Sequence, residues 1–565
     1  MSDATTSDRT PAPEEAVAEA MRTRSLPDLV ADCARRFGDR EALVWGDVRW
    51  SYAELARQAA GAAEGLRALG VQPGEPVGVL LPNWPEFFTV VAGITSLGAV
   101  AVCLNTMATE SELAFYLRHA GVERVVYTPR FLKHDYDAML SRIARGDGAG
   151  GGGAVPIRER VAILRDGTTL PDGARDWRDV APPHPGGAER LAVIAAEQDG
   201  LRDARAVMFF TSGSTAQPKA VLHAHRALVH QAFVASAAFG LDASDASWGC
   251  LPMFFAGGFV IIALITFARG GKVVLQDHFE AGRALDLMER EGITFYAGWQ
   301  LAPALCEHES FPRRKLRLRK GIYTNVAAAE KLLAPDNVTV GAYGLSETAT
   351  LVCAGRWTDP ADLRQRGFGR PLPGVEMRVV DPETRQPCAP GDVGELLVHG
   401  PSLMLGYLGL PASEAFDADG FFRTGDYGRL DETGTLRFDG RLKEVIKTAG
   451  VNVAAAEVEA CLESMADVAA AYVVPVPHPV RGENVGAFVV PRAGTAVDAA
   501  AVLEHCRHEM ASYKIPRHVF ALGAADVPRT GTQKVDKPRL RKLAAEKAGS
   551  AEDLAAAGSP DGAAR

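Results

Sequence analysis

The sequence predicts an α/β fold, in which helices cover a parallel sheet in αβα layers, followed by a small antiparallel β subdomain and a small α+β C-terminal domain. Apolar strands alternate with helices early in the chain, as in strand 76–81, helix 84–97 and strand 99–104, and this pattern indicates a parallel sheet covered on both faces. From about residue 366, short strands are punctuated by glycine and proline, which is typical of antiparallel pairing. After residue 440, helices and strands alternate in a compact segment.

Domain boundaries follow from these changes in pattern. We expect a large N-terminal domain over 25–439 and a small C-terminal domain over 440–545. Residues 1–24 are polar and alanine-rich, and residues 546–565 are rich in alanine and glycine. We therefore predict that both ends are disordered tails.

The individual elements follow from hydrophobic periodicity and turn residues. Residues 26–37 predict an amphipathic helix, and 42–45 and 48–51 predict a hairpin across Gly46-Asp47. Ser51 is placed to cap a helix that ends near residue 69. Further along, the patterns predict helix 110–120, strand 124–127, a flexible insertion over 145–154, strands 160–164 and 206–210, a buried helix over 259–268, strand 272–275, helix 281–291 and strand 293–296. The last third predicts strands 376–380, 394–398 and 435–438, helix 454–464, strands 470–475 and 485–490, helix 497–510 and strand 518–521.

Composition excludes several classes of protein. The net charge of −9 gives no reason to expect a nucleic-acid partner. The eight cysteines show no C-x-x-C or zinc-ligand spacing and most have apolar neighbours, which indicates buried thiols in a reducing compartment. The start of the chain lacks the features of a signal peptide, and the uncharged stretch 251–268 is interrupted by Pro252 and two glycines, so it is too short to span a bilayer. These observations predict a cytoplasmic protein.

One short stretch predicts an anion-binding loop. Thr211, Ser212, Gly213, Ser214 and Thr215 stand in a row after an apolar strand, and Lys219 follows them. Backbone N–H groups and hydroxyls in such a loop can surround a multiply charged anion, and the lysine adds a positive charge. A plain Ser/Thr/Gly surface turn is the alternative for this stretch taken alone.

Four further motifs supply what a nucleotide site needs. Glu347, in a segment that begins with Tyr343, is a carboxylate suited to Mg²⁺. Asp426 stands on a tight turn and can accept two hydrogen bonds from a ribose diol. Arg441 and Lys443 lie at the junction with the C-terminal segment, and Lys534 lies on a loop near its end.

In this order the motifs resemble the adenylate-forming superfamily of acyl-CoA synthetases, peptide-synthetase adenylation domains and luciferases, most of all an acyl- or aryl-CoA ligase. The resemblance covers about residues 25–545 and rests on Thr211–Lys219, Tyr343–Thr348, Arg423–Asp426, Gly440–Val453 and Pro528–Lys534. It implies that a carboxylate attacks Mg·ATP to form an acyl-adenylate and pyrophosphate, and that CoA then displaces AMP. It also implies a C-terminal domain that swings between the two steps.

The resemblance implies a role for each matching residue. Thr211, Ser212, Gly213, Ser214, Thr215 and Lys219 would hold the β- and γ-phosphates. Tyr343 would pack on adenine beside Gly344, Ser346 would touch the α-phosphate and Glu347 would bind Mg²⁺. Asp426 and Arg441 would hold the ribose, Lys443 would be the hinge, Gly450 would line the CoA path, and Lys534 would bridge the carboxylate and the α-phosphate.

The sequence departs from the family pattern at several positions. Alanine stands at 216 and 220 where the family has glycine, and alanine disfavours positive φ. Gln533 replaces the usual glycine before the lysine, and the segment 321–330 lacks the family's paired glycines against adenine. Phe255 stands where many relatives have histidine.

By position, the acyl pocket is predicted from Trp248, Phe255, Gly257, Trp299, Tyr323 and Thr324, although each aromatic side chain can equally belong to the core. Their sizes favour a small, medium or aromatic acid over a long acyl chain. Alternatives remain open: a stand-alone adenylating enzyme that loads a carrier protein or another nucleophile, a P-loop kinase or ATPase, and a non-catalytic relative. The P-loop motif is absent at 211–219, which counts against the second.

Overall fold

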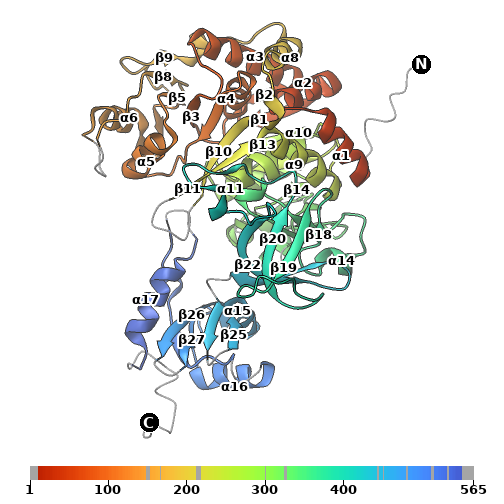
Figure 1. The fold of residues 1–565 in the computed structure, drawn as a ribbon, viewed down its shortest axis with the longest axis vertical. Coiled ribbons are helices and arrows are strands. Elements are labelled where there is room, and N and C mark those ends of the chain that lie inside the picture. Colours follow the sequence, from red (N-terminus) through yellow and green to blue (C-terminus); the bar gives the residue numbers. More distant parts are fainter. Residues whose placement is uncertain are drawn as a thin grey trace. The chain divides into compact units, whose positions relative to one another are not determined.

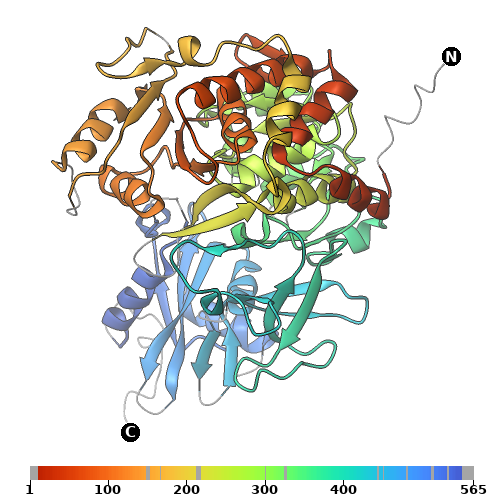
Figure 2. The ribbon, with the colours of Figure 1, turned by 45° about the horizontal axis from the view of Figure 1, so that its top comes forward.

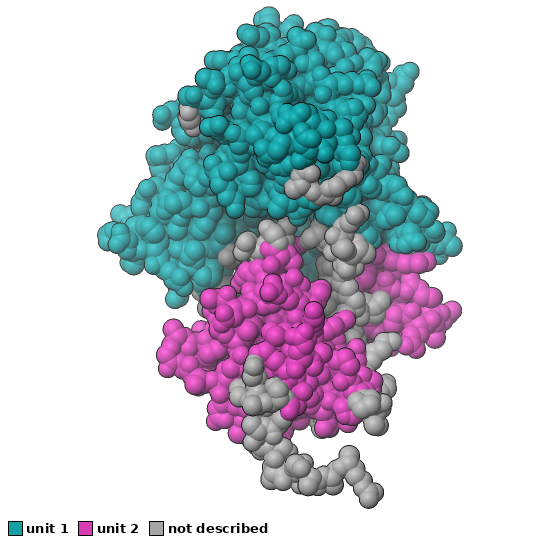
Figure 3. Space-filling view, turned by 90° about the vertical axis from the view of Figure 1, so that its left-hand side faces the viewer, with its two compact units in different colours: residues 1–377, 398–422, 434–436 teal, residues 378–397, 423–433, 437–565 magenta. Residues whose placement is uncertain are grey.

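The computed structural model describes residues 11–147, 153–165, 167–211, 218–298, 301–323, 327–441, 445–448, 451–478, 481–510, 514–530 and 534–549. They form two compact units: unit 1 comprises residues 1–377, 398–422 and 434–436, and unit 2 comprises residues 378–397, 423–433 and 437–565 (Figures 1 and 3). Within the described ranges, no helix has both the length and the apolar composition that crossing a membrane requires.

Unit 1 contains the predicted parallel sheets. The larger sheet has the strand order β21 (Gly406–Tyr407), β11 (Lys219–Ala224), β10 (Arg205–Thr211), β4 (Val100–Cys103), β3 (Pro76–Leu80), β5 (Arg124–Tyr127), β8 (Glu159–Ala162) and β9 (Arg175–Asp176). Strands β10, β4, β3, β5, β8 and β9 pair in parallel, whereas β11 is antiparallel to both of its neighbours. The predicted α/β class is confirmed.

A second sheet of unit 1 has the order β15 (Lys320–Gly321), β14 (Phe295–Tyr296), β12 (Ala246–Gly249), β13 (Lys272–Leu275), β1 (Glu41–Trp45) and β2 (Val48–Ser51). The predicted hairpin β1–β2 forms its antiparallel edge, and the other pairs are parallel. Smaller sheets join β16 (Ala342–Tyr343), β17 (Cys353–Ala354) and β18 (Arg370–Pro371), and β6 (Arg130–Phe131) with β7 (His134–Asp135).

Helices cover these sheets (Figure 2). The buried apolar side chains between helices and sheets form a large cluster with smaller clusters beside it. Helix α2 (Leu26–Phe37) begins at Ser25, whose hydroxyl accepts from the amide of Asp28, and Ser51 caps α3 (Tyr52–Ala68) in the same way. Further helices of unit 1 are α4 (Pro85–Ser96), α5 (Glu110–Ala120), α6 (Tyr136–Arg145), α7 (Trp177–Val180), α8 (Gly187–Ala196), α9 (His225–Ala238), α10 (Ile265–Phe267), α11 (Ala281–Arg290), α12 (Ala302–Glu307), α13 (Ala327–Leu332) and α14 (Ala361–Gln365). The predicted buried helix near 259–268 begins as a wide π-helix over Gly257–Leu264 and continues as α10.

The prediction of a disordered stretch over 1–24 is wrong for residues 13–22. They form helix α1 (Pro13–Arg22), which buries Ala16 and Ala20. The carboxylate of Glu19 accepts a hydrogen bond of 2.7 Å from Arg269, whose guanidinium is buried. The helix forms because it supplies this counter-charge and covers apolar surface, two long-range effects that its polar composition does not reveal.

Unit 2 contains most residues of a four-stranded sheet with the order β19 (Glu376–Val380), β20 (Gly394–His399), β22 (Phe422–Leu430) and β23 (Leu436–Arg441). A second sheet has the order β25 (Val451–Ala454), β24 (Val445–Thr448), β27 (Gly482–Pro491) and β26 (Val468–His478), and β28 (His518–Ala521) also pairs with β27. Helices α15 (Ala455–Glu463), α16 (Ala499–Glu509) and α17 (Lys537–Lys547) accompany it. Unit 2 therefore includes most residues of β19, β20 and β22, which precede the expected domain boundary at residue 440.

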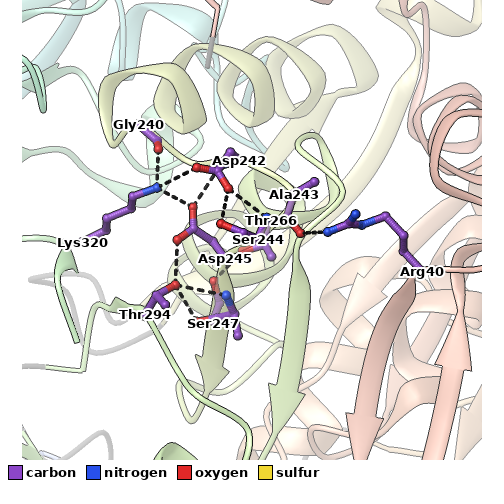
Figure 4. A network of polar contacts seen from close by, with 11 residues as sticks. Arg40, Gly240, Asp242, Ala243, Ser244, Asp245, Ser247, Thr266, Thr294 and Lys320 are labelled. Atoms are coloured by element: carbon purple, nitrogen blue, oxygen red, sulfur yellow. Dashed lines mark hydrogen bonds and ion pairs between the residues drawn. The ribbon is translucent and has the colours of Figure 1, made fainter. Parts of the chain in front are cut away.

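A buried polar network ties together the amino ends of β12, β14 and β15 (Figure 4). The Lys320 ammonium group donates to the carbonyl of Gly240 and to Asp245 Oδ2, both at 2.6 Å, and lies 3.2 Å from Asp242 Oδ2. The hydroxyl of Thr294 donates to Asp245 Oδ1 at 2.7 Å. The network pairs a buried ammonium group with carboxylates, so that neither charge is left uncompensated in the core.

Candidate active site

The predicted anion-binding loop connects two antiparallel strands of unit 1, β10 and β11 (Figure 2). Thr211 ends β10 and Lys219 begins β11, and the two residues face each other across the hairpin. The Thr211 hydroxyl lies 3.5 Å from the Lys219 carbonyl oxygen. Ser212, Gly213, Ser214 and Thr215 lie outside the described residues, as does Ala216. Both ends of the loop are thus held by a ladder of backbone hydrogen bonds.

The polar side chains of Thr211, Lys219 and His223 lie on one face of this hairpin. Because side chains alternate between the faces of a strand, Lys219, Val221 and His223 share a face of β11, and Thr211 lies directly opposite Lys219. Ala220 points to the other face and is buried beneath it. It has the extended conformation of a strand residue and not a positive φ, so alanine is compatible with this position.

Strand β21 places an aromatic side chain on the same face. Tyr407 pairs with Val221, and Lys219 is the next residue along that face of β11. The Lys219 ammonium group lies 4.5 Å from the centroid of the Tyr407 ring. This is a cation–π contact, which holds the ammonium group at the end of the loop.

Glu347 reaches this cluster from a short 3₁₀ turn, Ser346–Thr348. The Tyr407 hydroxyl donates to Glu347 Oε1 at 2.8 Å, and the amide of Met404 donates to the Glu347 carbonyl oxygen, also at 2.8 Å. Oε2 accepts no hydrogen bond from any described residue. One carboxylate oxygen is therefore held in place while the other can bind a cation.

Ser346 is fixed by His223. Nε2 of His223 lies 2.7 Å from the Ser346 carbonyl oxygen, and this contact requires that Nε2 carries the proton. Burial lowers the pKa of His223 to about 4, which the hydrogen bond to Ser346 only partly offsets. The imidazole is therefore neutral near pH 7 and serves as a donor to the turn.

The backbone around Tyr343 and Gly344 is tightly packed. Tyr343 is buried on β16, and its ring meets Phe368 edge-on at 6.4 Å. A Cβ atom at Gly344 would lie 1.6 Å from the Thr350 carbonyl oxygen, so only glycine fits. Thr350 itself has φ of 97°, an unfavourable conformation for a β-branched residue. Such strain is typical of functional sites.

The remaining predicted nucleotide-binding residues belong to unit 2. Asp426 is buried on β22, where its amide donates to the Thr424 hydroxyl at 3.0 Å. Arg441 ends β23. Lys534 is exposed, and its carbonyl oxygen accepts a hydrogen bond of 2.7 Å from the amide of Thr530. Lys443, Gly450 and Gln533 lie outside the described residues.

Of the predicted acyl-pocket residues, Trp248 lies near the carboxyl end of β12 and Tyr323 follows the carboxyl end of β15. Trp248 has 1% of its surface exposed, donates to Gln276 Oε1 at 3.0 Å and stacks on Tyr296. The Tyr296 hydroxyl donates to the Gly298 carbonyl oxygen at 2.6 Å. Trp248 is therefore a core residue with its polar group satisfied.

Three other predicted pocket residues are partly exposed. Phe255 packs on Phe254 at 4.6 Å, and a Cβ atom at Gly257 would meet only Leu251, at 3.9 Å. Tyr323 follows β15, and its amide donates to the Val340 carbonyl oxygen at 2.7 Å. Trp299 and Thr324 lie outside the described residues, as do residues 325 and 326 of the glycine-poor segment.

The sequence-based prediction missed His223, Met404 and Tyr407. Strand alternation after the loop could have placed His223 on the face of Lys219. The local sequence contains no comparable signal for Tyr407 or Met404, because their positions depend on β21 pairing with a strand almost two hundred residues earlier.

This arrangement is suited to binding a polyphosphate together with a divalent cation. It brings together a hydroxyl at Thr211, an ammonium group at Lys219 and a carboxylate oxygen at Glu347. No cluster of three or more metal-ligating side chains occurs in the described part of the chain. A single carboxylate suits Mg²⁺, which keeps waters and takes its other ligands from substrate phosphates.

Comparison with known proteins decides the family. The model of the AMP-binding enzyme family matches residues 30–408, and that of the AMP-binding enzyme C-terminal domain matches residues 457–534. The chain belongs to the AMP-binding enzyme family. The predicted membership of the adenylate-forming superfamily is confirmed, with an acyl- or aryl-CoA ligase as its nearest type.

Relatives of this family match along nearly the whole chain. A 3-[(3aS,4S,7aS)-7a-methyl-1,5-dioxo-octahydro-1H-inden-4-yl]propanoyl:CoA ligase of Mycobacterium tuberculosis is 32% identical and is covered to 99%, with 92% of this chain aligned. A feruloyl-CoA synthase of Amycolatopsis is 30% identical with the same coverage. An anthranilate CoA ligase structure, 23% identical, shares the fold with a TM-score of 0.77 over 93% of this chain and 98% of its own. This AMP-binding enzyme is thus an ATP-dependent, AMP-forming acid–thiol ligase.

Proposed function

We propose that this enzyme joins a ring-bearing carboxylic acid to the thiol of CoA in two steps. The acid first attacks the α-phosphate of ATP, which releases pyrophosphate and leaves an acyl-adenylate. CoA then displaces AMP. The observation that carries the proposal is the convergence of Thr211, Lys219 and Glu347 at one end of the β10–β11 hairpin.

In the first step, the loop and Lys219 hold the β- and γ-phosphates while Ser346 contacts the α-phosphate. Glu347 would hold Mg²⁺, and the ion would supply positive charge that neutralises the phosphates. Tyr343 and Gly344 form the adenine site, and Asp426 and Arg441 hold the ribose. Attack at phosphorus depends mainly on positioning and charge neutralisation, and these groups supply both.

Lys534 provides the remaining positive charge, between the carboxylate and the α-phosphate. We place the domain boundary at residue 440, with domains over 25–439 and 440–545, and the hinge at Lys443. Gly450 then lines the path of CoA in the second step. Lys534 is exposed, which is consistent with a group that engages substrate in only one step.

The substrate class is inferred from the pocket and the relatives. Phe255 and Tyr323, which are partly exposed and follow β12 and β15 in the chain, offer aromatic surface to a substrate. The two curated relatives above carry names that specify an indene-ring propanoyl group and a feruloyl group. Both names also specify CoA as acceptor, which favours CoA over a carrier protein or another nucleophile. We place the enzyme in the cytoplasm, where ATP and CoA are abundant and where its eight free cysteines stay reduced.

A panel of acids tests the substrate class. Pyrophosphate release would be measured with ferulate, salicylate, a fused-ring propanoate, acetate and palmitate at equal concentrations. A ring-bearing acid is expected to give the highest kcat/KM. Strong preference for palmitate would contradict the proposed pocket.

A further inference from the structure

Tyr407 contacts two side chains that bind ligands of opposite charge in the proposed mechanism. Its hydroxyl donates to Glu347, the proposed Mg²⁺ ligand, at 2.8 Å. Its ring lies 4.5 Å beneath the ammonium group of Lys219, the proposed phosphate ligand. All three residues lie within unit 1.

The backbone sets the position of Tyr407 independently of these contacts. The amide of Leu405 donates to Leu222 at 2.8 Å and that of Leu408 to Ala220 at 2.9 Å, which ties residues 405–408 to β11. The neighbouring Met404 amide donates to the carbonyl oxygen of Glu347. The tyrosine is therefore anchored both to the strand that carries Lys219 and to the turn that carries Glu347.

The two contacts have different chemical effects. A hydroxyl bound to one carboxylate oxygen fixes the rotation of the carboxylate, so that the other oxygen points in one direction. Partners of this kind commonly orient metal ligands, and their loss typically lowers metal affinity or activity by about 10–100-fold. The ring restrains a long, flexible lysine without neutralising its charge.

We propose that Tyr407 is a positioning residue for adenylate formation: its hydroxyl orients Glu347 toward Mg²⁺, and its ring orients Lys219 toward the phosphates of ATP. The proposal rests on the proposed function, because it takes the roles of Glu347 and Lys219 from it.

Two variants separate the hydroxyl from the ring. Tyr407→Phe keeps the ring and removes the hydroxyl, whereas Tyr407→Met fills similar space and removes both. Pyrophosphate release would be measured against Mg²⁺ at saturating ATP and against ATP at saturating Mg²⁺. We expect Tyr407→Phe to raise the Mg²⁺ concentration for half-maximal activity about tenfold while KM for ATP stays close to that of the wild type. Tyr407→Met is expected to raise KM for ATP about fivefold in addition.

Tyr127→Phe is the matched control, since the Tyr127 hydroxyl also donates to a carboxylate, that of Asp137, at 2.5 Å. It should leave the Mg²⁺ dependence unchanged. A second test combines Tyr407→Phe with Glu347→Gln: because the hydroxyl acts through Glu347, the double variant should match Glu347→Gln in its Mg²⁺ dependence. Thioester formation from a supplied acyl-adenylate verifies that each variant is folded.

The outcomes distinguish the two proposals. If the wild-type enzyme releases no pyrophosphate with any acid, the proposed function fails. If the wild type is active but Tyr407→Phe and Tyr127→Phe show the same Mg²⁺ dependence, the positioning role of the hydroxyl is overturned. The same conclusion follows if Tyr407→Phe adds its full effect on the Mg²⁺ dependence to that of Glu347→Gln. Equal KM for ATP in Tyr407→Phe and Tyr407→Met would overturn the role of the ring.

Discussion

Nε2 of His223 lies 2.7 Å from the carbonyl oxygen of Ser346 and donates its proton to it. This hydrogen bond joins the strand after the phosphate loop to the turn that carries Ser346 and Glu347. The geometry of that turn should therefore depend on a side chain that contacts no substrate itself.

His223→Ala is expected to lower kcat/KM for ATP in adenylate formation by about three- to tenfold, the usual effect of one neutral hydrogen bond. His223→Gln, which retains an N–H donor, should lose less. His230→Ala is the control, because His230 is also buried and its Nε2 contacts the Pro373 carbonyl oxygen at 3.1 Å. Equal losses of activity in the two alanine variants would mean that His223 acts only through stability.

Replacement of Lys320 should strongly destabilise the fold. Lys320→Met leaves Asp245 without its ammonium partner at 2.6 Å in a site where that carboxylate is 1% exposed. An uncompensated buried charge typically costs about 3–5 kcal/mol. Urea denaturation would measure this loss, and adding Asp245→Asn should restore much of it. The control, Arg67→Met, breaks a solvent-exposed ion pair with Glu197 and should cost less than about 1 kcal/mol. Comparable losses in the two single variants would contradict the interpretation.

Stability should fall as the pH drops below about 6.5, the usual pKa of histidine in an unfolded chain. Burial lowers the pKa of His223 to about 4, of His225 to about 3 and of His230 to about 4. Between these values and 6.5 the unfolded chain binds more protons than the folded protein, so protonation favours unfolding. The free energy of unfolding should therefore be highest above pH 6.5 and fall by up to about 4 kcal/mol per pH unit when all three sites contribute.

Chemical denaturation between about pH 5.5 and 7.5 measures how the free energy of unfolding changes with pH. This range lies above the usual pKa values of carboxylates, so histidines dominate the change. His230→Gln should reduce the slope by about one third, because it removes one of the three sites. An unchanged slope in this variant would show that His230 does not titrate as its burial requires.

Lys534→Ala should separate the two half-reactions. We expect a loss of about 10²–10³ in the rate of adenylate formation, the usual effect of removing a group that stabilises transition-state charge. Thioester formation from a supplied acyl-adenylate and CoA should be retained. Lys537→Ala, a neighbouring substitution, is the control and should leave both rates near those of the wild type. An equal loss in both half-reactions would remove the role proposed for Lys534.

Local patterns predicted most of the fold. Helix α2 and strand β5 have the predicted bounds, since amphipathic periodicity and apolar runs depend on near neighbours. Helix α1 was missed because Glu19 and the buried Ala16 make their contacts with distant residues. Strands β21, β24 and β25 were also missed, since segments of two to four residues are defined mainly by their partners.

In the candidate site, too, features that depend on near neighbours were predicted and features that depend on distant partners were not. Thr211, Lys219 and Glu347 stand in compact motifs that the sequence displays directly. Tyr407 joins Lys219 and Glu347 only because β21 pairs with β11, and pairing over such a distance leaves no local signal. The concern that Ala220 would distort the loop was resolved only by the structure, which places it in an extended strand.

Product analysis tests the central claim most directly. The enzyme would be incubated with ATP, Mg²⁺ and each acid of the panel, with and without CoA, and the nucleotide and acyl products would be separated and quantified. The account predicts AMP and pyrophosphate, with an acyl-CoA when CoA is present and enzyme-bound acyl-adenylate when it is omitted. Formation of ADP and phosphate, or an AMP-forming reaction that never yields an acyl-CoA with any acid of the panel, would contradict it.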